Sequence, residues 1–85
     1  MESHVAAIRS ILATHGQLMV DVASLDDRDD LYENGMTSHA SVNVMLALEA
    51  EFDVEFPDTL LRRSTFQSIA AINETLDSLG VRGSA

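Results

Sequence analysis

Ser38 is the residue whose type and position are best suited to carry chemistry in this chain. It lies in Gly35-Met36-Thr37-Ser38-His39, where a polar loop passes into a segment with helical periodicity. The backbone N–H groups and the positive dipole end at the start of a helix both favour a negative charge. A phosphate ester on Ser38 would be stabilised there, so the sequence predicts a site of covalent modification.

Two other interpretations of Ser38 are open. A serine at the start of a helix most often serves as its N-cap. A serine beside His39 could also be a nucleophile with an adjacent base, which would make the chain a small hydrolase able to turn over activated esters alone. Neighbouring residues in a helix point about 100° apart and do not face each other, so this second interpretation is the weaker one.

The acidic loop before Ser38 does not match a calcium-binding loop. Such a loop needs a glycine at its sixth place and a glutamate at its twelfth. Counted from Asp26, those places hold Leu31 and Thr37. We therefore expect no specific metal site.

Composition narrows the classes of partner. The chain of 85 residues has a formal net charge of −9, with 14 acidic residues against five arginines. Nucleic acids and anionic membrane surfaces are poor partners for such a chain, because they need cationic neutralisation. Proteins with basic patches are the expected partners, although acidity can also serve solubility alone. The chain has no cysteine, which excludes thiol chemistry of its own.

Length and hydropathy favour one small domain. We expect a single monomeric domain over residues 1–80 and a flexible C-terminal tail over 81–85. No apolar run approaches the roughly 20 residues of a membrane span, and Met1-Glu2-Ser3-His4 does not resemble a secretory signal. The expected location is the cytoplasm.

Apolar periodicity predicts an all-α fold, a small four-helix bundle of three main helices and one short helix. Ser3 is the expected N-cap of the first helix. Ser64 and Gln67 have the spacing of a capping box for the last one, which Gly80 should end. The expected helices span residues 3–15, 38–53, 58–62 and 65–79, with a long anchored connection over 16–37.

The helix over 38–53 has two apolar faces. One arc should face the core and holds Ser41, Val44, Met45, Leu48 and Phe52. Val42 and Leu46 lie on another arc with Ser38, which a helix packed on one side does not need internally. The predicted docking surface comprises Met36, Thr37, His39, Val42, Leu46 and Glu49. The predicted core comprises Leu31, Val44, Met45, Leu48, Phe52, Phe56, Phe66, Ile69, Ile72 and Leu76.

The stretch from Asp30 to Ser38, followed by Val42 to Phe52 and Val54 to Asp58, resembles the acyl carrier protein family, which includes peptidyl and aminoacyl carriers. The resemblance covers most of residues 25–79. Its shared positions are a glycine three residues before the serine, a Leu-Glu-x-x-Phe helix end and a Val-x-x-Pro segment. In this chain they are Gly35, Ser38, Leu48, Glu49, Phe52, Val54 and Pro57.

The resemblance implies that Ser38 carries a 4′-phosphopantetheine arm, added from coenzyme A by a phosphopantetheinyl transferase. An acyl or aminoacyl group would then travel as a thioester between a loading ligase and a downstream acceptor enzyme, so the chain itself would not be an enzyme. The form Gly-Met-Thr-Ser is similar to stand-alone carriers loaded with amino acids by synthetase-like ligases. The cargo stays open among amino acid, fatty acyl and polyketide groups. The alternative is a non-carrier acidic domain that binds proteins through helix 38–53 and does not need Ser38.

Overall fold

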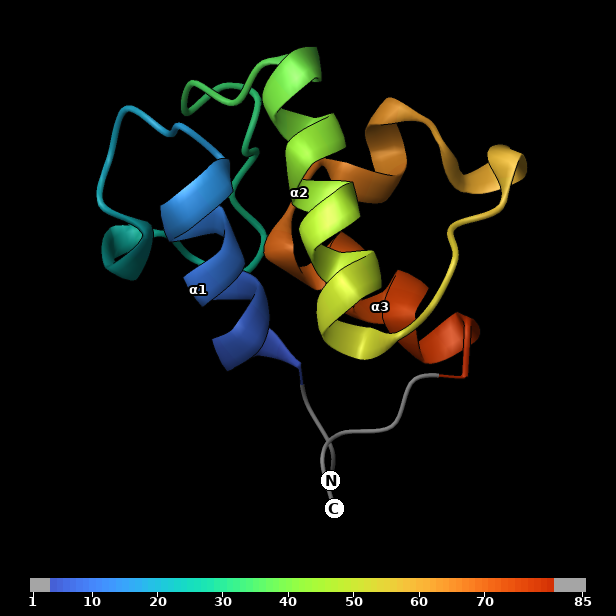
Figure 1. Ribbon diagram of the computed structural model, residues 1–85. Helices are drawn as coiled ribbons and strands as arrows, with labels where there is room; N and C mark the ends of the chain where they lie inside the picture. The colour runs from blue at the N-terminus through green and yellow to red at the C-terminus, as the bar shows by residue number, and fades with distance from the viewer. Residues whose placement is uncertain (1–3, 81–85) are drawn as a thin grey trace.

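The computed structural model describes residues 4–80, and these form three α-helices and three short 3₁₀ helices without any strand (Figure 1). Their bounds are α1 (Val5–His15), η1 (Val22–Ser24), α2 (Ser38–Phe52), η2 (Asp58–Leu60), η3 (Arg63–Phe66) and α3 (Ile69–Ser78). Helix α1 packs against both α2 and α3. The predicted all-α fold is confirmed, whereas the predicted cap Ser3 and the tail 81–85 lie outside the described residues.

Helix α2 has the buried face that its periodicity predicts. Val44 and Leu48 are completely buried, and so is Ala40, which the predicted core omits. Ser41 is also buried, but its hydroxyl donates a hydrogen bond of 2.7 Å to the carbonyl of Ser38. Burial of this polar group is therefore compensated. The helix ends at Phe52, and its C-cap Asp53 takes the left-handed conformation with φ of 54°.

The long connection over residues 16–37 is anchored at several points. The Arg9 guanidinium donates to the Val22 carbonyl at 2.8 Å and to the Asp27 carboxylate at 2.7 Å. The Asp27 carbonyl in turn accepts the backbone N–H of Ala70 in the first turn of α3. The connection also contributes buried apolar side chains, namely Val22, Leu25, Leu31 and Met36. These contacts confirm that the segment is not a free linker.

Helix α3 begins four residues later than predicted, because Ser68 rather than Ser64 is its N-cap. The Ser68 hydroxyl accepts the N–H of Ala71 at 3.0 Å, whereas the segment containing Ser64 forms η3. Gln67 does not reach back to a cap and donates its side-chain amide to Asp30 at 3.0 Å. The predicted capping box is therefore wrong. Gly80, with φ of 85°, follows the helix end as predicted.

The predicted core is confirmed except at two positions. Met45 and Phe52 are only partly buried and pack against the edge of the core, and the others are buried. Ile8 and Leu12 of α1 are completely buried as well. Among residues 4–80 we find no helix with the length and apolar character needed to cross a membrane.

Candidate functional site

The turn before Ser38 requires a glycine. Gly35 has φ of 110°, a conformation that residues with a side chain rarely adopt. A Cβ at this position would lie 2.6 Å from Met19 Cγ and 2.9 Å from Met19 N. The two segments approach this closely because the Met19 N–H donates to the Asn34 carbonyl at 2.8 Å. Gly35 thus lets the connection fold back on itself and deliver the chain to the start of α2.

Thr37 caps α2 and leaves the Ser38 hydroxyl uncommitted. The Thr37 side-chain oxygen accepts the N–H of Ala40 at 3.0 Å, and Ser38 is the first residue of the helix. Ser38 is exposed, and no group within residues 4–80 forms a hydrogen bond with its hydroxyl. The imidazole of His39 does not form one either. The interpretation of Ser38 as a cap is therefore wrong, and the Ser–His pair has no contact to support it. The hydroxyl is open to modification.

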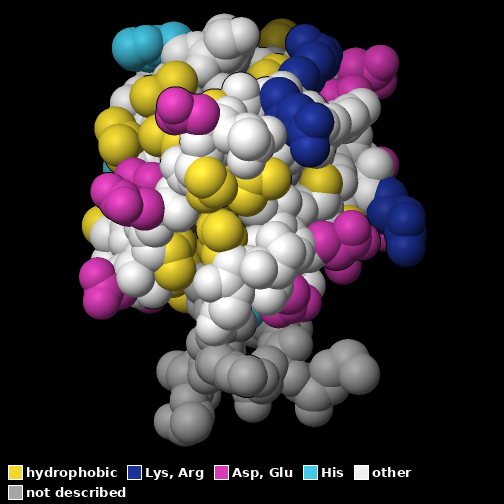
Figure 2. All heavy atoms as spheres, turned by 90° about the vertical axis from the view of Figure 1, so that its right-hand side faces the viewer, with side chains coloured by type: hydrophobic (Ala, Val, Ile, Leu, Met, Phe, Trp, Pro, Cys, Tyr) yellow, Lys and Arg dark blue, Asp and Glu magenta, His cyan; other side chains and the backbone are white. Residues whose placement is uncertain are grey.

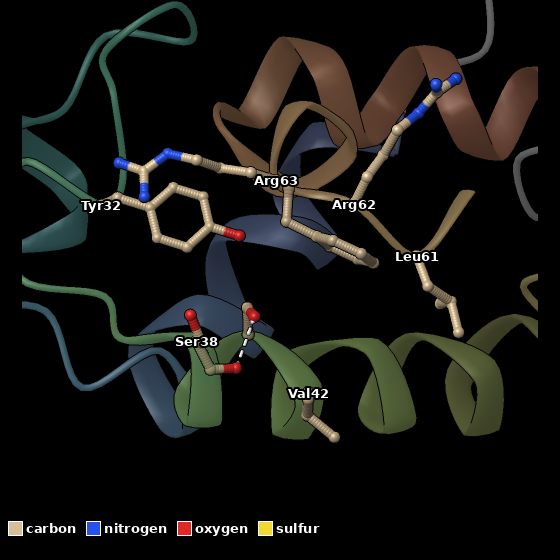
Figure 3. Close-up of a pocket in the computed structure, with 8 residues that line it drawn as sticks. Tyr32, Ser38, Val42, Leu61, Arg62 and Arg63 are labelled. Atoms are coloured by element: carbon tan, nitrogen blue, oxygen red, sulfur yellow. Dashed lines mark hydrogen bonds between the residues drawn. The ribbon is translucent and has the colours of Figure 1, made fainter. Parts of the chain in front are cut away.

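A hollow of about 300 Å³ lies beside Ser38. Ser38, Ser41 and Val42 of α2 form one side, and the chain from Leu61 to Phe66 forms the other (Figure 3). In this view the hydroxyl end of Tyr32 and the side chain of Ser38 both point into the space between the two sides. The lining residues are Tyr32, Ser38, Ser41, Val42, Leu61, Arg62, Arg63 and Phe66.

Charged groups beside the hollow are held in place by the fold. The Arg63 guanidinium carbon lies 4.2 Å from the centre of the Tyr32 ring, a cation–π contact. Asp30 accepts the backbone N–H groups of Tyr32 and Glu33 at 2.8 and 3.1 Å. The hydrogen bond from Glu33 is the main cause that lowers the pKa of Asp30, with smaller contributions from Gln67, Tyr32 and the Arg63 charge, against desolvation. Asp30 is thus held as a carboxylate.

The predicted docking surface is only partly available. Val42 and Leu46 are exposed at 49% and 52%, and Thr37 and His39 are exposed beside Ser38. Figure 2 shows that hydrophobic side chains gather on one face of the molecule between acidic and basic ones. Met36 is 3% exposed and belongs to the core, so the structure removes it from this surface.

Glu49 is engaged in the fold. It is half-buried, and its carboxylate accepts the N–H of Phe56 at 2.8 Å while its carbonyl accepts that of Val54 at 3.2 Å. These bonds hold the chain that leaves α2 against the helix. A contact between Glu49 and a basic partner residue stays a prediction, and one of its carboxylate oxygens already has a partner inside the molecule.

The far side of the hollow is not predicted by the sequence pattern. Tyr32, Leu61 and Arg62 come from loops and Arg63 begins the short helix η3, and in such segments apolar periodicity gives no orientation. One signal was present in the sequence, because Arg62 and Arg63 are adjacent in a chain with only five basic residues. This concentration of positive charge in an acidic chain could have drawn attention to the segment.

An exposed serine at the first position of α2, with its hydroxyl unused by the fold, is able to carry a covalently attached group. The family model for the phosphopantetheine attachment site matches residues 6–76. This chain belongs to that family of phosphopantetheine-binding carrier proteins, and 4′-phosphopantetheine is the covalent cofactor of the family. The exposed, uncommitted hydroxyl of Ser38 fits such an attachment.

The similar proteins point to one branch of the family. The chain is 52% identical over 71 residues to the aminoacyl carrier protein of Agrobacterium fabrum, which covers 84% of this chain and 86% of the relative. It also matches, at 51% identity and a TM-score of 0.84, a structure of an engineered Bradyrhizobium japonicum glycine:[carrier protein] ligase complexed with the Agrobacterium tumefaciens carrier protein and AMP. That match covers 86% of this chain and 97% of the other.

A more distant structure extends this similarity. It contains the Bradyrhizobium japonicum ligase complexed with a glycylated carrier protein, and it matches at 28% identity with a TM-score of 0.73. The match covers 85% of this chain and 96% of the other. The predicted resemblance to carrier proteins is therefore confirmed.

Proposed function

We propose that Ser38 is the attachment residue and that this carrier holds an amino acid. The observation that supports the proposal most directly is the exposed Ser38 hydroxyl at the start of α2, released from capping by Thr37. The negative phosphodiester would lie at the positive end of the helix dipole, next to free backbone N–H groups. Ser41 is the poorer acceptor because it is 8% exposed and its hydroxyl already donates to Ser38.

The arm supplies the thiol that this cysteine-free chain lacks. An aminoacyl group bound to that thiol as a thioester would be delivered from a ligase to an acceptor enzyme. The amino acid assignment rests on the 52% identity to an aminoacyl carrier protein and on the glycine ligases that accompany the similar structures. The chain acts in this scheme as a carrier and leaves catalysis to its partners.

Loading and attachment both require another protein to reach Ser38. Val42 and Leu46 lie one and two turns further along α2 and are half exposed, so they offer apolar contact area beside the serine. Thr37 and His39 flank the modified position. A phosphopantetheinyl transferase and a synthetase-like amino acid:carrier protein ligase would dock on this surface, the first to attach the arm and the second to load it.

The first test is attachment, measured by intact mass. The protein and its Ser38→Ala variant are incubated with coenzyme A and a broad-specificity phosphopantetheinyl transferase. We expect a single phosphopantetheine addition on the wild type and none on the variant. Ser41→Ala is the matched control and should be modified normally. Absence of any addition to the wild type would favour the alternative of an acidic interaction domain.

The second test is loading. The modified protein is incubated with ATP, the Bradyrhizobium japonicum glycine:[carrier protein] ligase and glycine, or other amino acids one at a time. We expect a further mass increase equal to one aminoacyl residue, which hydroxylamine removes because it cleaves thioesters. Modification without loading by any amino acid would leave the carrier role intact and exclude this cargo for that ligase.

A further inference from the structure

The basic residues of this acidic chain are unevenly distributed. Of five arginines, two line the hollow beside Ser38. Arg9 is bound to Asp27 at 2.7 Å, whereas Arg62 and Arg63 form no ion pair with any residue in the range 4–80. Unpaired arginines beside a serine that receives a phosphodiester indicate electrostatic complementarity to that group.

Arg63 is the arginine of this pair that the fold holds beside Tyr32. Its guanidinium lies against the Tyr32 ring, 4.2 Å from the ring centre, whereas Arg62 extends away from the hollow in Figure 3. The guanidinium in this contact forms no ion pair with any residue from 4 to 80, and its five N–H groups can still donate hydrogen bonds. The stack therefore restricts Arg63 without consuming the donors that a phosphate oxygen needs.

Tyr32 adds a second donor on the same side. Its ring supports Arg63, and its hydroxyl points into the hollow that Ser38 also lines. No residue described between 4 and 80 hydrogen-bonds that hydroxyl, while the Tyr32 backbone N–H is fixed on Asp30 at 2.8 Å. The Tyr32 side chain is half-buried, so a hydrogen bond there competes less with bulk water.

Asp30 offsets part of the Arg63 charge, since that charge contributes to lowering the pKa of Asp30, but the two side chains do not form an ion pair. Its carboxylate accepts from Tyr32 and Glu33 N–H groups and from the Gln67 side-chain amide at 3.0 Å. It forms no ion pair within 4.0 Å of Arg63. The carboxylate helps to position the loop that holds Tyr32, and the guanidinium keeps charge available for another anion.

We propose that Tyr32 and Arg63 form a binding site for the phosphodiester of the arm on Ser38. The Arg63 N–H groups and the Tyr32 hydroxyl would donate to the phosphate oxygens on the side opposite the α2 N-terminus. This inference rests on the proposed attachment at Ser38. The site would fix the first part of the arm at the entrance of the hollow and so set the direction in which the cargo leaves the protein.

The test uses the full chain carrying phosphopantetheine and measures its ³¹P NMR resonance, which responds to hydrogen bonding of the phosphodiester. Three variants are compared with the wild type, namely Arg63→Gln, Tyr32→Phe and the control Arg28→Gln. Arg28→Gln changes the net charge by the same amount as Arg63→Gln. Arg28 is exposed and does not line the hollow, so its replacement leaves the proposed site intact. Tyr32→Phe keeps the ring beneath Arg63 and removes only the hydroxyl.

We expect Arg63→Gln and Tyr32→Phe each to shift the ³¹P resonance, while Arg28→Gln leaves it at the wild-type position. The Nε–H resonance of Arg63 should also move when the wild type is converted from its unmodified to its modified form.

Backbone amide spectra verify folding, and Tyr32→Phe decides alone if Arg63→Gln unfolds. Coincident ³¹P resonances in wild type and Tyr32→Phe, or an equal shift in Arg28→Gln, would overturn the site. Absence of phosphopantetheine on the wild type, seen by mass, would overturn the attachment at Ser38 itself.

Discussion

Thr37 caps α2, and Ser38 presents a hydroxyl that the fold does not use. Thr37 satisfies the N–H of Ala40 at 3.0 Å, and Ser38 therefore does not have to turn its hydroxyl toward the helix. A hydroxyl that caps a helix is partly withdrawn from solvent and holds a fixed rotamer. The side chain before Ser38 thus has a structural reason to be a good cap, and threonine meets that need.

This division predicts that Thr37→Val destabilises the fold without touching Ser38. Valine keeps the shape of threonine but cannot accept the Ala40 N–H, so the free energy of unfolding should fall by about 1 kcal/mol. Thr37→Ser retains the cap and should stay near the wild type. Urea denaturation followed by circular dichroism measures both. Equal stability of Thr37→Val and wild type would mean that the cap contributes nothing.

Around Ser38, the positions whose direction follows from helix geometry were predicted correctly. Val42 and Leu46 were expected on an exposed arc and are exposed. Met36 and Glu49 were assigned to the same surface, and they are respectively buried and bound to Phe56. Met36 precedes the helix, where periodicity does not apply, and the Glu49 partner is a backbone N–H that no sequence pattern reveals.

At the scale of elements, one face of α2 packs in the core and the opposite face is exposed. Ala40, Val44 and Leu48 are completely buried and fix the helix to the core, so the opposite side presents Ser38, Val42 and Leu46 on a rigid support. A surface on a rigid helix is ordered before the partner arrives, which lowers the entropic cost of docking. The segment opposite α2, which contains η3, forms the other side of the hollow. It is not a regular α-helix.

We predict that Leu46→Asp prevents loading while the fold stays intact. The substitution introduces a carboxylate at the centre of the apolar contact, where hot-spot changes commonly exceed 1 kcal/mol. The kcat/KM for loading by the ligase should fall at least about tenfold, equivalent to roughly 1.4 kcal/mol. Ala6→Asp, an exposed position on α1, adds the same charge and should load normally. Normal loading of Leu46→Asp would exclude this face as the dock.

The start of α3 gives a second test at this scale. Ser68 caps the helix and Ser64 is exposed within η3, although sequence spacing favoured Ser64. Ser68→Ala should lower the free energy of unfolding by about 1 kcal/mol, whereas Ser64→Ala should change it by less than about 0.5 kcal/mol. Urea denaturation distinguishes the two serines. The reverse order would support the capping box that the structure lacks.

For the whole molecule, the three main helices, their order and their core faces followed from the sequence because apolar periodicity is a local signal, whereas the 3₁₀ helices η1 and η3 were not predicted. The exact start of α3 and the path of residues 53–68 did not follow, since tertiary contacts decide them. Gln67 is an example, because its side chain binds Asp30, 37 positions earlier in the chain. Long-range contacts of this kind also build the hollow, which is why its far side was not predicted.

The formal net charge of −9 predicts that partner docking depends on salt. A carrier with this charge is attracted over long range by a basic partner surface, and salt screens that attraction because the Debye length falls from about 10 Å at 0.1 M to about 3 Å at 1 M. Apolar contacts at Val42 and Leu46 are not screened in this way, so docking should weaken at high salt without being abolished. The KM of the ligase for the modified carrier should therefore rise with NaCl, while its KM for ATP serves as the internal control. A carrier KM that stays constant from low to high ionic strength would show that the acidity serves solubility and that the apolar face alone directs recognition.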